Sequence, residues 1–249
     1  MIPKIIHACW LGKAKMPQEQ VEYIEGWKKL HPDYEVILWN DEMFEKYYDD
    51  SLFVKESLEK KKYGFLSDYF RFTVLYEFGG IYVDTDIEMF KNLDQFLNSK
   101  MFMGFIFDSS IGTALIGSEK GNPIMLEWKK ILESDYEAKH NFTVSNDWIT
   151  KYFLEHFSDF RLNGKRQSLK CGIEIYPKDY FERYKVDKKS DGGFSEHHCY
   201  GSWNDDKVPG YKKLIKKLLP RKIVSKIGHK RFLKKTPYYE VYKKHIKEK

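Results

Sequence analysis

Two carboxylates one residue apart, Asp84 and Asp86, are the clearest candidates for chemistry in this chain. They follow the short apolar run at residues 81–83, whose composition predicts a buried strand. Carboxylates at the point where a strand enters a loop supply the hard oxygen ligands that a divalent cation prefers. Such an ion can neutralise the charge that builds on a diphosphate as it leaves. Because an isolated Asp-x-Asp is also common in solvated turns, the surrounding elements must decide between the two interpretations.

The residues before this pair predict a helix with a sharp end. From residue 64 to 78 apolar residues recur at helical spacing, and Asp68 and Arg71 stand three residues apart, on one face of the helix. The double glycine at 79–80 then ends the helix, since glycine adopts left-handed backbone conformations without steric cost. Ligands of open α/β sheets bind at the carboxyl ends of the strands. The helix, the glycines and the strand therefore predict one ligand site around Asp84.

Residues 67–86, SDYFRFTVLYEFGGIYVDTD, resemble the core motif of glycosyltransferase family 32, the transferases with a DXD-containing sugar-binding region. This family includes bacterial capsule and O-antigen transferases and yeast mannosyltransferases, and it is distantly similar to the large clostridial glucosylating toxins. The matching positions are Ser67, Asp68, Arg71, Phe78, Gly79, Gly80, Tyr82, Asp84 and Asp86. The resemblance implies an α/β fold of the GT-A type, a Rossmann-like mixed sheet flanked by helices.

The resemblance also implies roles for single residues. Asp84 and Asp86 would hold a metal against the diphosphate of a nucleotide sugar, and both are therefore expected to be catalytic residues. Donor binding is expected from Asp68, Arg71, Tyr82 and Thr85. The opening residues 2–12 match a further family motif, Ile-Pro-Lys-Ile-Ile-His-x-x-Trp-x-Gly, by which Trp10 lies against the nucleotide base. Stacking on a base contributes about 1–3 kcal/mol. A core tryptophan at a strand end is the alternative.

A second motif lies late in the chain, where residues 197–203 read HHCYGSW. Family members carry His-His-x-x-Gly-Ser-Trp near the end of the catalytic domain. By resemblance to transferases with a His-x-x-Gly motif, His198 is the preferred metal ligand and His197 the second candidate, while Ser202 and Trp203 would close over the diphosphate. Histidine favours Mn²⁺, and Mg²⁺ is the alternative ion. A structural cluster of histidine and tryptophan is the alternative.

Asn146 and Asp147 are the remaining catalytic candidates. They loosely resemble the Asp-Gln-Asp stretch of retaining galactosyltransferases, which places polar groups beside the anomeric carbon; an N-cap of the following helix is the equal alternative. Small residues at 109–113 would allow a sugar to approach closely. The family resemblance implies retention of the anomeric configuration. Because no carboxylate stands out as a covalent nucleophile, same-face attack by the acceptor hydroxyl is the working mechanism.

The elements expected elsewhere agree with this fold class. Strands are predicted at 4–10, 34–39, 101–107, 113–117 and 173–176, and helices at 18–30, 123–132 and 148–157. The early order of strand, helix, strand and helix is typical of a nucleotide-binding α/β fold. The lone His7 has no evident partner and is expected to be structural. Three cysteines without metal or redox spacing are expected to be free thiols.

Charge divides the chain unevenly. Residues 207–249 contain 16 Lys and Arg against two Glu, whereas the rest contains 27 basic and 35 acidic residues. We therefore expect a catalytic domain over 1–206 and a basic amphipathic helical tail over 207–249. Such a tail favours an anionic membrane surface. A solvated helix pair is the alternative, and no nucleic acid is expected because no binding motif accompanies the charge.

Together these observations predict a retaining, metal-dependent transferase that uses a UDP-sugar, such as UDP-galactose or UDP-N-acetylglucosamine. The expected acceptor is a lipid-linked oligosaccharide of capsule or O-antigen synthesis, and the expected location is cytoplasmic, on the inner face of the plasma membrane. An aspartate-dependent phosphohydrolase is one alternative, although Glu88 stands where its motif has Thr or Val. A non-catalytic protein that binds membrane or nucleic acid through its tail is the other.

Overall fold

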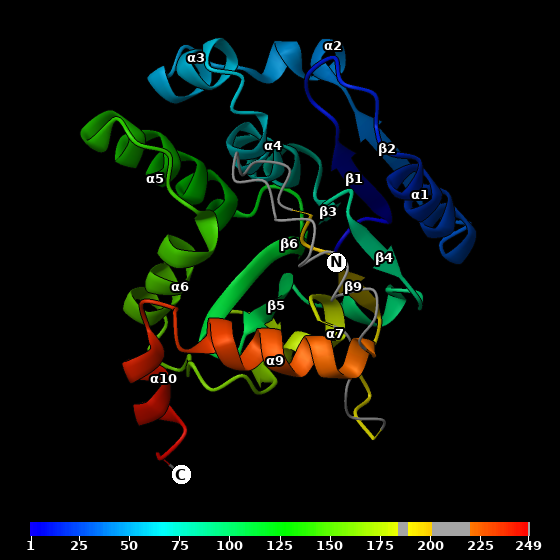
Figure 1. Ribbon diagram of the computed structural model, residues 1–249. Coiled ribbons are helices and arrows are strands. Elements are labelled where there is room, and N and C mark those ends of the chain that lie inside the picture. Colours follow the sequence, from blue (N-terminus) through cyan, green and yellow to red (C-terminus); the bar gives the residue numbers. More distant parts are fainter. Residues whose placement is uncertain (184–188, 201–219, 249) are drawn as a thin grey trace.

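The computed structural model describes residues 1–183, 189–200 and 220–248. Their centre is a seven-stranded mixed sheet in the order β2-β1-β3-β6-β5-β8-β7 (Figure 1). Five of its strands run parallel to one another, and β6 and β7 run against them. The strands are β1 (Ile5–Cys9), β2 (Glu35–Trp39), β3 (Gly80–Val83), β5 (Met101–Phe107), β6 (Ser110–Ser118), β7 (Gln167–Ser168) and β8 (Ile173–Tyr176).

Helices flank this sheet. They are α1 (Gln18–Leu30), α2 (Asp41–Phe44), α3 (Leu52–Glu59), α4 (Tyr63–Phe78), α5 (Pro123–Lys139), α6 (Ser145–His156), α7 (Lys178–Phe181), α9 (Arg221–Leu233) and α10 (Tyr239–His245), with short 3-10 turns at Glu45–Tyr47 and Asp94–Phe96. The predicted α/β class is confirmed. The predicted helix over 64–78 and the strand after it are confirmed as α4 and β3.

Successive side chains of the central strands point to opposite faces of the sheet, as the two-residue period of a strand requires, and pack into one hydrophobic core on each face. On one face Tyr82, Met103 and Ile116 pack with α3, α4, α5 and α6. On the other face Ile81 and Leu115 pack with α1, α7 and the segment after β3. Both faces are therefore covered, which leaves the carboxyl edge of the parallel strands as the place for a ligand.

A second, two-stranded sheet pairs β4 (Ile87–Met89) with β9 (Ser195–His197) in antiparallel fashion. The sequence did not predict it, because three residues are too few to show a strand period. Its register sets His197 opposite Ile87, the residue that directly follows Asp86 of the DXD motif. The indole of Trp27 on α1 donates to the Ile87 carbonyl at 2.9 Å and so fixes β4 on the body.

The described part of the basic tail lies on the body. Phe232 of α9 stacks on Phe107, the last residue of β5, with 5.7 Å between ring centroids, and α10 adds Tyr238, Val241 and Tyr242 to the core of the first face. The expected boundary at residue 206 falls outside the described residues, as does the first basic segment at 207–219. Among the residues that are described, no helix combines the length and apolarity needed to cross a membrane.

Candidate metal and donor site

Three side chains meet beyond the end of β3. One oxygen each of Asp84 and Asp86 and one ring nitrogen of His197 all lie within 4.8 Å of one another. The backbone N–H of Asp84 donates to the Ala114 carbonyl of β6 at 2.8 Å, so the chain stays paired to the sheet up to the first carboxylate. The site predicted at the carboxyl edge is therefore formed by two distant parts of the chain.

The glycine pair explains how α4 turns directly into β3. Gly79 and Gly80 have φ angles of 67° and 98°, which L side chains rarely adopt. A Cβ on Gly79 would come within 2.5 Å of the Lys120 backbone nitrogen, and one on Gly80 within 2.6 Å of the Ile5 carbonyl oxygen. Close backbone approach thus demands glycine at both positions, and this turn fixes α4 relative to the strand end.

His7 is structural, as expected. Its Nε2 lies 2.9 Å from the Gly79 carbonyl, and its Nδ1 accepts from the Trp39 indole at 3.2 Å. That arrangement places the ring proton on Nε2. Burial lowers the pKa of His7 to about 4, so the ring is neutral at pH 7. It ties the glycine turn to β1 and β2 and takes no part in the site's chemistry.

A buried ionic network supports the first carboxylate. Arg71 lies 3.2 Å from Asp68 and 3.1 Å from Asp84, and it donates to the Thr113 carbonyl at 2.8 Å. Its side chain and that of Asp68 are only 5% and 8% exposed. Burial raises the pKa of Asp68 to about 6 and also raises that of Asp84, where Asp86 adds to the effect and Arg71 opposes it. The site therefore carries more negative charge than Arg71 balances.

Tyr82 differs from its expected role. Its hydroxyl donates to Asp84 Oδ1 at 2.6 Å, the Arg71 guanidinium lies 4.6 Å from its ring centroid, and the side chain is buried. A residue so enclosed by protein orients the carboxylate. It does not offer a surface to a donor.

The second carboxylate pairs with histidine. His197 Nε2 lies 3.3 Å from Asp86 Oδ1, and Nδ1 lies 2.9 Å from Glu182 Oε2. Burial opposes ionisation of Asp86, yet the hydrogen bond with His197 holds the pKa of that carboxyl below its usual value. Glu182 was not predicted from the sequence, because it belongs to no recognised motif. Only its burial beside His197 identifies it as a candidate functional residue.

His198, the preferred ligand in the sequence analysis, lies elsewhere. Its ring stacks on Tyr23 of α1 and on Tyr200, with centroids 5.1 and 5.6 Å away, and its Nε2 lies 3.0 Å from Glu88. The structure brings His197 to the carboxylates instead, because neighbouring residues of an extended segment point to opposite sides. The preference for His198 is corrected accordingly.

The remaining donor-binding candidates surround this centre unevenly. Trp10 is half-buried at the carboxyl end of β1, with its indole donating to the Ala14 carbonyl at 2.6 Å. The Thr85 hydroxyl donates to Gln20 on α1 at 2.9 Å. Ser202 and Trp203 lie outside the described residues. Trp10 thus stays a candidate for the base, at the sheet edge that carries the carboxylates.

Asn146 and Asp147 both lie in the first turn of α6, but their surroundings differ. The residue at the N-cap is Val144, so the capping alternative is wrong for both. Asn146 Oδ1 accepts from the Thr113 hydroxyl at 2.7 Å, while Asp147 is exposed in the first turn. Ser145, next to them, donates to Asp68 at 3.1 Å. Asn146 is therefore linked to the Arg71 network, and Asp147 has no such link.

The donor set suits a divalent cation. Two carboxylates and one imidazole are acceptable to Mn²⁺, whose preferences lie between oxygen and nitrogen ligands, and Mg²⁺ would use the carboxylates alone. The surplus of negative charge around Asp84 gives such an ion a favourable place. The residues present thus fit the metal that the sequence motif implies.

Comparison with known proteins agrees with this geometry. Residues 17–103 match the family described as "Glycosyltransferase sugar-binding region containing DXD motif". Inositol phosphoceramide mannosyltransferase 3 of Schizosaccharomyces pombe is 32% identical over 128 residues, 51% of this chain and 36% of the relative. An uncharacterized glycosyltransferase, L373, of Acanthamoeba polyphaga mimivirus is 26% identical over 225 residues, 82% of this chain and 84% of its own. The chain thus spans about a third of the yeast relative's length.

A solved structure supports the fold. The PaToxG glycosyltransferase superposes with a TM-score of 0.51 at 19% identity, covering 62% of this chain and 70% of its own. The mixed sheet flanked by helices confirms the predicted GT-A-type architecture. Residues 17–103 of this chain therefore match the DXD-containing sugar-binding region of the glycosyltransferases, which confirms the resemblance stated from its sequence motif.

Proposed function

We propose that this protein transfers a sugar from a nucleotide sugar to a glycan acceptor with the help of a divalent cation. The observation that carries the proposal is the meeting of three side chains at the end of β3: Asp84 and Asp86, which lie inside the matched DXD region, and His197, which lies outside it. When bound, the cation would neutralise the diphosphate that leaves with the nucleoside. Mn²⁺ is the proposed ion, because imidazole completes the ligand set.

The protein's own residues do the positioning. Tyr82 and Arg71 hold Asp84 by hydrogen bonds of 2.6 and 3.1 Å, so this ligand is oriented before any ion arrives. Such preorganisation lowers the cost of ordering groups in the transition state. Retention of the anomeric configuration is part of the proposal, with Asn146, which is linked to the Arg71 network through Thr113, as the candidate polar group beside the anomeric carbon. Asp147 is a weaker candidate, since it is exposed.

The proposed donor is a UDP-sugar. Trp10 would stack on the base, and Ser202 and Trp203 would cover the diphosphate. UDP-galactose and UDP-N-acetylglucosamine remain the first candidates. The names of two relatives, an inositol phosphoceramide mannosyltransferase and the mannosyl phosphorylinositol ceramide synthase SUR1 of Saccharomyces cerevisiae, favour mannose as a further candidate sugar. They also support an acceptor that carries a lipid, and a lipid-linked oligosaccharide of surface polysaccharide synthesis is the form proposed.

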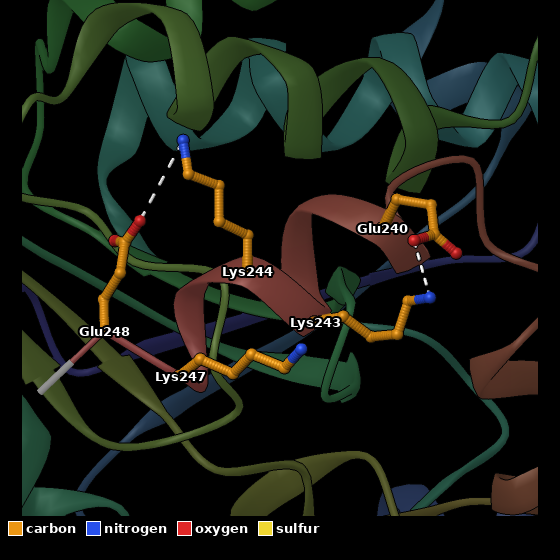
Figure 2. A pocket seen from close by; sticks show the side chains of 5 residues that line it. All are labelled: Glu240, Lys243, Lys244, Lys247 and Glu248. Atoms are coloured by element: carbon orange, nitrogen blue, oxygen red, sulfur yellow. Dashed lines mark ion pairs between the residues drawn. The ribbon is translucent and has the colours of Figure 1, made fainter.

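The basic tail would bring the enzyme to that lipid at the cytoplasmic face of the plasma membrane. Ile223 and Ile227, one helical turn apart on α9, are 44% and 58% exposed. Figure 2 shows the side chains that line a pocket at α10 and the residues after it: Lys243, Lys244 and Lys247 together with Glu240 and Glu248. Exposed apolar residues beside lysines suit an anionic bilayer surface, where each lysine contributes about 1 kcal/mol. The division into a domain over 1–206 and a tail over 207–249 is kept as part of this proposal.

The transfer proposal is tested by donor hydrolysis. The protein is incubated with Mn²⁺ and UDP-, GDP- and dTDP-sugars, and release of nucleoside diphosphate is followed for the natural chain and for Asp86→Asn. Release from one donor, lost in the variant, supports a transferase and identifies its sugar. Absence of release and of any Mn²⁺-dependent thermal shift with every donor would contradict it.

The membrane proposal has a separate test. Because α10 packs into the core, point variants are better than a truncation that would expose it. Flotation with vesicles containing phosphatidylglycerol is measured for three proteins. They are the full chain, the double variant Ile223→Ser/Ile227→Ser and the triple variant Lys243→Glu/Lys244→Glu/Lys247→Glu. Reduced flotation of both variants supports the tail as the membrane element. If all three proteins float no better with these anionic vesicles than with neutral vesicles, the membrane proposal is contradicted.

A further inference from the structure

Glu182 is a fully buried carboxylate whose presence needs a reason. It follows α7 and is 0% exposed, and burying a charged carboxylate is costly unless it is paired. Its Oε1 accepts from the Ala114 N–H at 3.3 Å, and its Oε2 lies 2.9 Å from Nδ1 of His197. The backbone N–H of His197 also donates to the Glu182 carbonyl at 3.3 Å. Both side-chain oxygens are thus engaged, one of them by the histidine of the candidate metal site.

The sheet leaves room for this carboxylate. A Cβ on Gly112 of β6 would come within 2.2 Å of Glu182 Oε1 and within 2.6 Å of its Cδ. The small residue expected to admit a sugar thus admits a carboxylate instead. Since β6, α7 and β9 each contribute to the contact, the position of Glu182 is set by the fold and does not depend on a mobile side chain.

We propose that Glu182 is a positioning residue for His197. This inference rests on the metal site proposed above. By accepting the Nδ1–H at 2.9 Å, the carboxylate would keep that proton on the inner nitrogen. Nε2, which faces Asp86 at 3.3 Å, would then be the nitrogen that exchanges its hydrogen-bond proton for a cation. Carboxylates behind ligating histidines fix the tautomer and raise the ligand's basicity, and their loss typically weakens metal binding 10- to 100-fold.

A purely structural role makes a different prediction. If Glu182 served only to hold β9 against α7, its replacement would lower thermal stability and leave the Mn²⁺ affinity of the folded protein unchanged. If Glu182 positions His197, the variant Glu182→Gln would disturb the site, because its side-chain NH₂ must face either the backbone N–H of Ala114 or Nδ1 of His197. The first arrangement leaves two donors facing each other, and the second moves the ring proton to Nε2, which blocks the metal.

The test compares Mn²⁺ dissociation constants of the folded proteins by isothermal titration calorimetry. Glu182→Gln is expected to bind 10- to 100-fold more weakly than the natural chain. Glu88→Gln is the matched control, because Glu88 bonds the neighbouring His198, and it is expected to stay within threefold. Equal Mn²⁺ affinity of the natural chain and folded Glu182→Gln would overturn the inference. Absence of Mn²⁺ binding in the natural chain would instead overturn the proposed metal site on which it rests.

A second measurement does not depend on a variant that folds. ¹⁵N NMR of the natural protein loaded with diamagnetic Zn²⁺ reports the protonation of each histidine ring nitrogen, with His197 assigned by its loss in His197→Gln. A proton on Nδ1 and a metal-shifted Nε2 are expected. A proton on Nε2, as His7 has, would overturn the inference.

Discussion

Asp84 and Asp108 occupy equivalent places in the sheet but have opposite surroundings. Each is the first residue after a strand, β3 or β5, and these two strands run in the same direction because both are antiparallel to β6. Asp108 is contacted by Lys178 at 2.5 Å and by His229 at 3.0 Å. Asp84 shares Arg71 with Asp68 and has a further carboxylate two residues along.

The pKa values of the two groups differ accordingly. Burial raises the pKa of Asp84, with Asp86 adding to it against Arg71. Burial also opposes ionisation of Asp108, yet His229 and Lys178 hold its pKa below the usual value. A carboxylate at a strand end is thus a candidate metal ligand where nearby carboxylates outnumber cationic side chains, as at Asp84. It has a structural role where cationic side chains pair with it, as at Asp108. The comparison shows why position alone does not identify a site.

The largest effect is expected from Asp84→Asn. The amide keeps an oxygen to accept from Tyr82 and Arg71 but removes a negative ligand, so Mn²⁺ affinity and donor hydrolysis should each fall at least about 100-fold. Titration calorimetry and nucleoside diphosphate release measure the two losses. Retained affinity in a folded variant would mean that Asp84 resembles Asp108 after all.

Arg71→Met should have the next largest effect. It leaves Asp68 and Asp84 buried without their shared cation, and loss of one partner of a buried ion pair costs about 3–5 kcal/mol. Chemical denaturation measures this loss. Added Mn²⁺ should restore more stability to the variant than to the natural chain, since it supplies the missing charge. Arg71→Lys is the control and should lose less.

Asp108→Asn should lower stability by about 1–3 kcal/mol, because the partly buried ammonium of Lys178 loses its charged partner. Hydrogen exchange in α9 should increase, as His229 is released. The Mn²⁺ affinity should not change. A loss of affinity equal to that of Asp84→Asn would show that the two strand ends are not independent.

Asp68→Asn should have the smallest effect, and its sign depends on pH. The pKa of Asp68 is raised by burial to about 6, so the natural metal-free protein loses stability as pH rises from about 4 through 6. The variant lacks this loss and should be more stable by about 1 kcal/mol at pH 8, or about 2–4 °C in Tm, and equal at pH 3.5. Thermal scans with a chelator at both pH values measure this. A less stable variant at pH 8 would show that the Arg71 pair outweighs burial.

The part of this molecule that local patterns encode was predictable. The helical period of α4, the glycine pair and the apolar β3 are contiguous, so the sequence predicted this half of the site together with the fold class. Glu182 and the β4–β9 ladder were not predictable, because a three-residue strand has no measurable period and a single buried carboxylate has no motif. The preference for His198 failed for the same reason, since the ladder register that selects His197 depends on residues more than a hundred positions away.

This ladder has a consequence for the order of events during synthesis. The carboxylates are present once Asp86 has been added to the growing chain, whereas Glu182 and His197 arrive over ninety residues later. Contacts between such distant segments form late, because the chain entropy of closing the loop opposes them. A nascent chain that has completed β1 to β6 would hold the sheet together before it could retain a cation. Metal capture would then report completion of the catalytic unit, and growing chains would stay inactive on the ribosome.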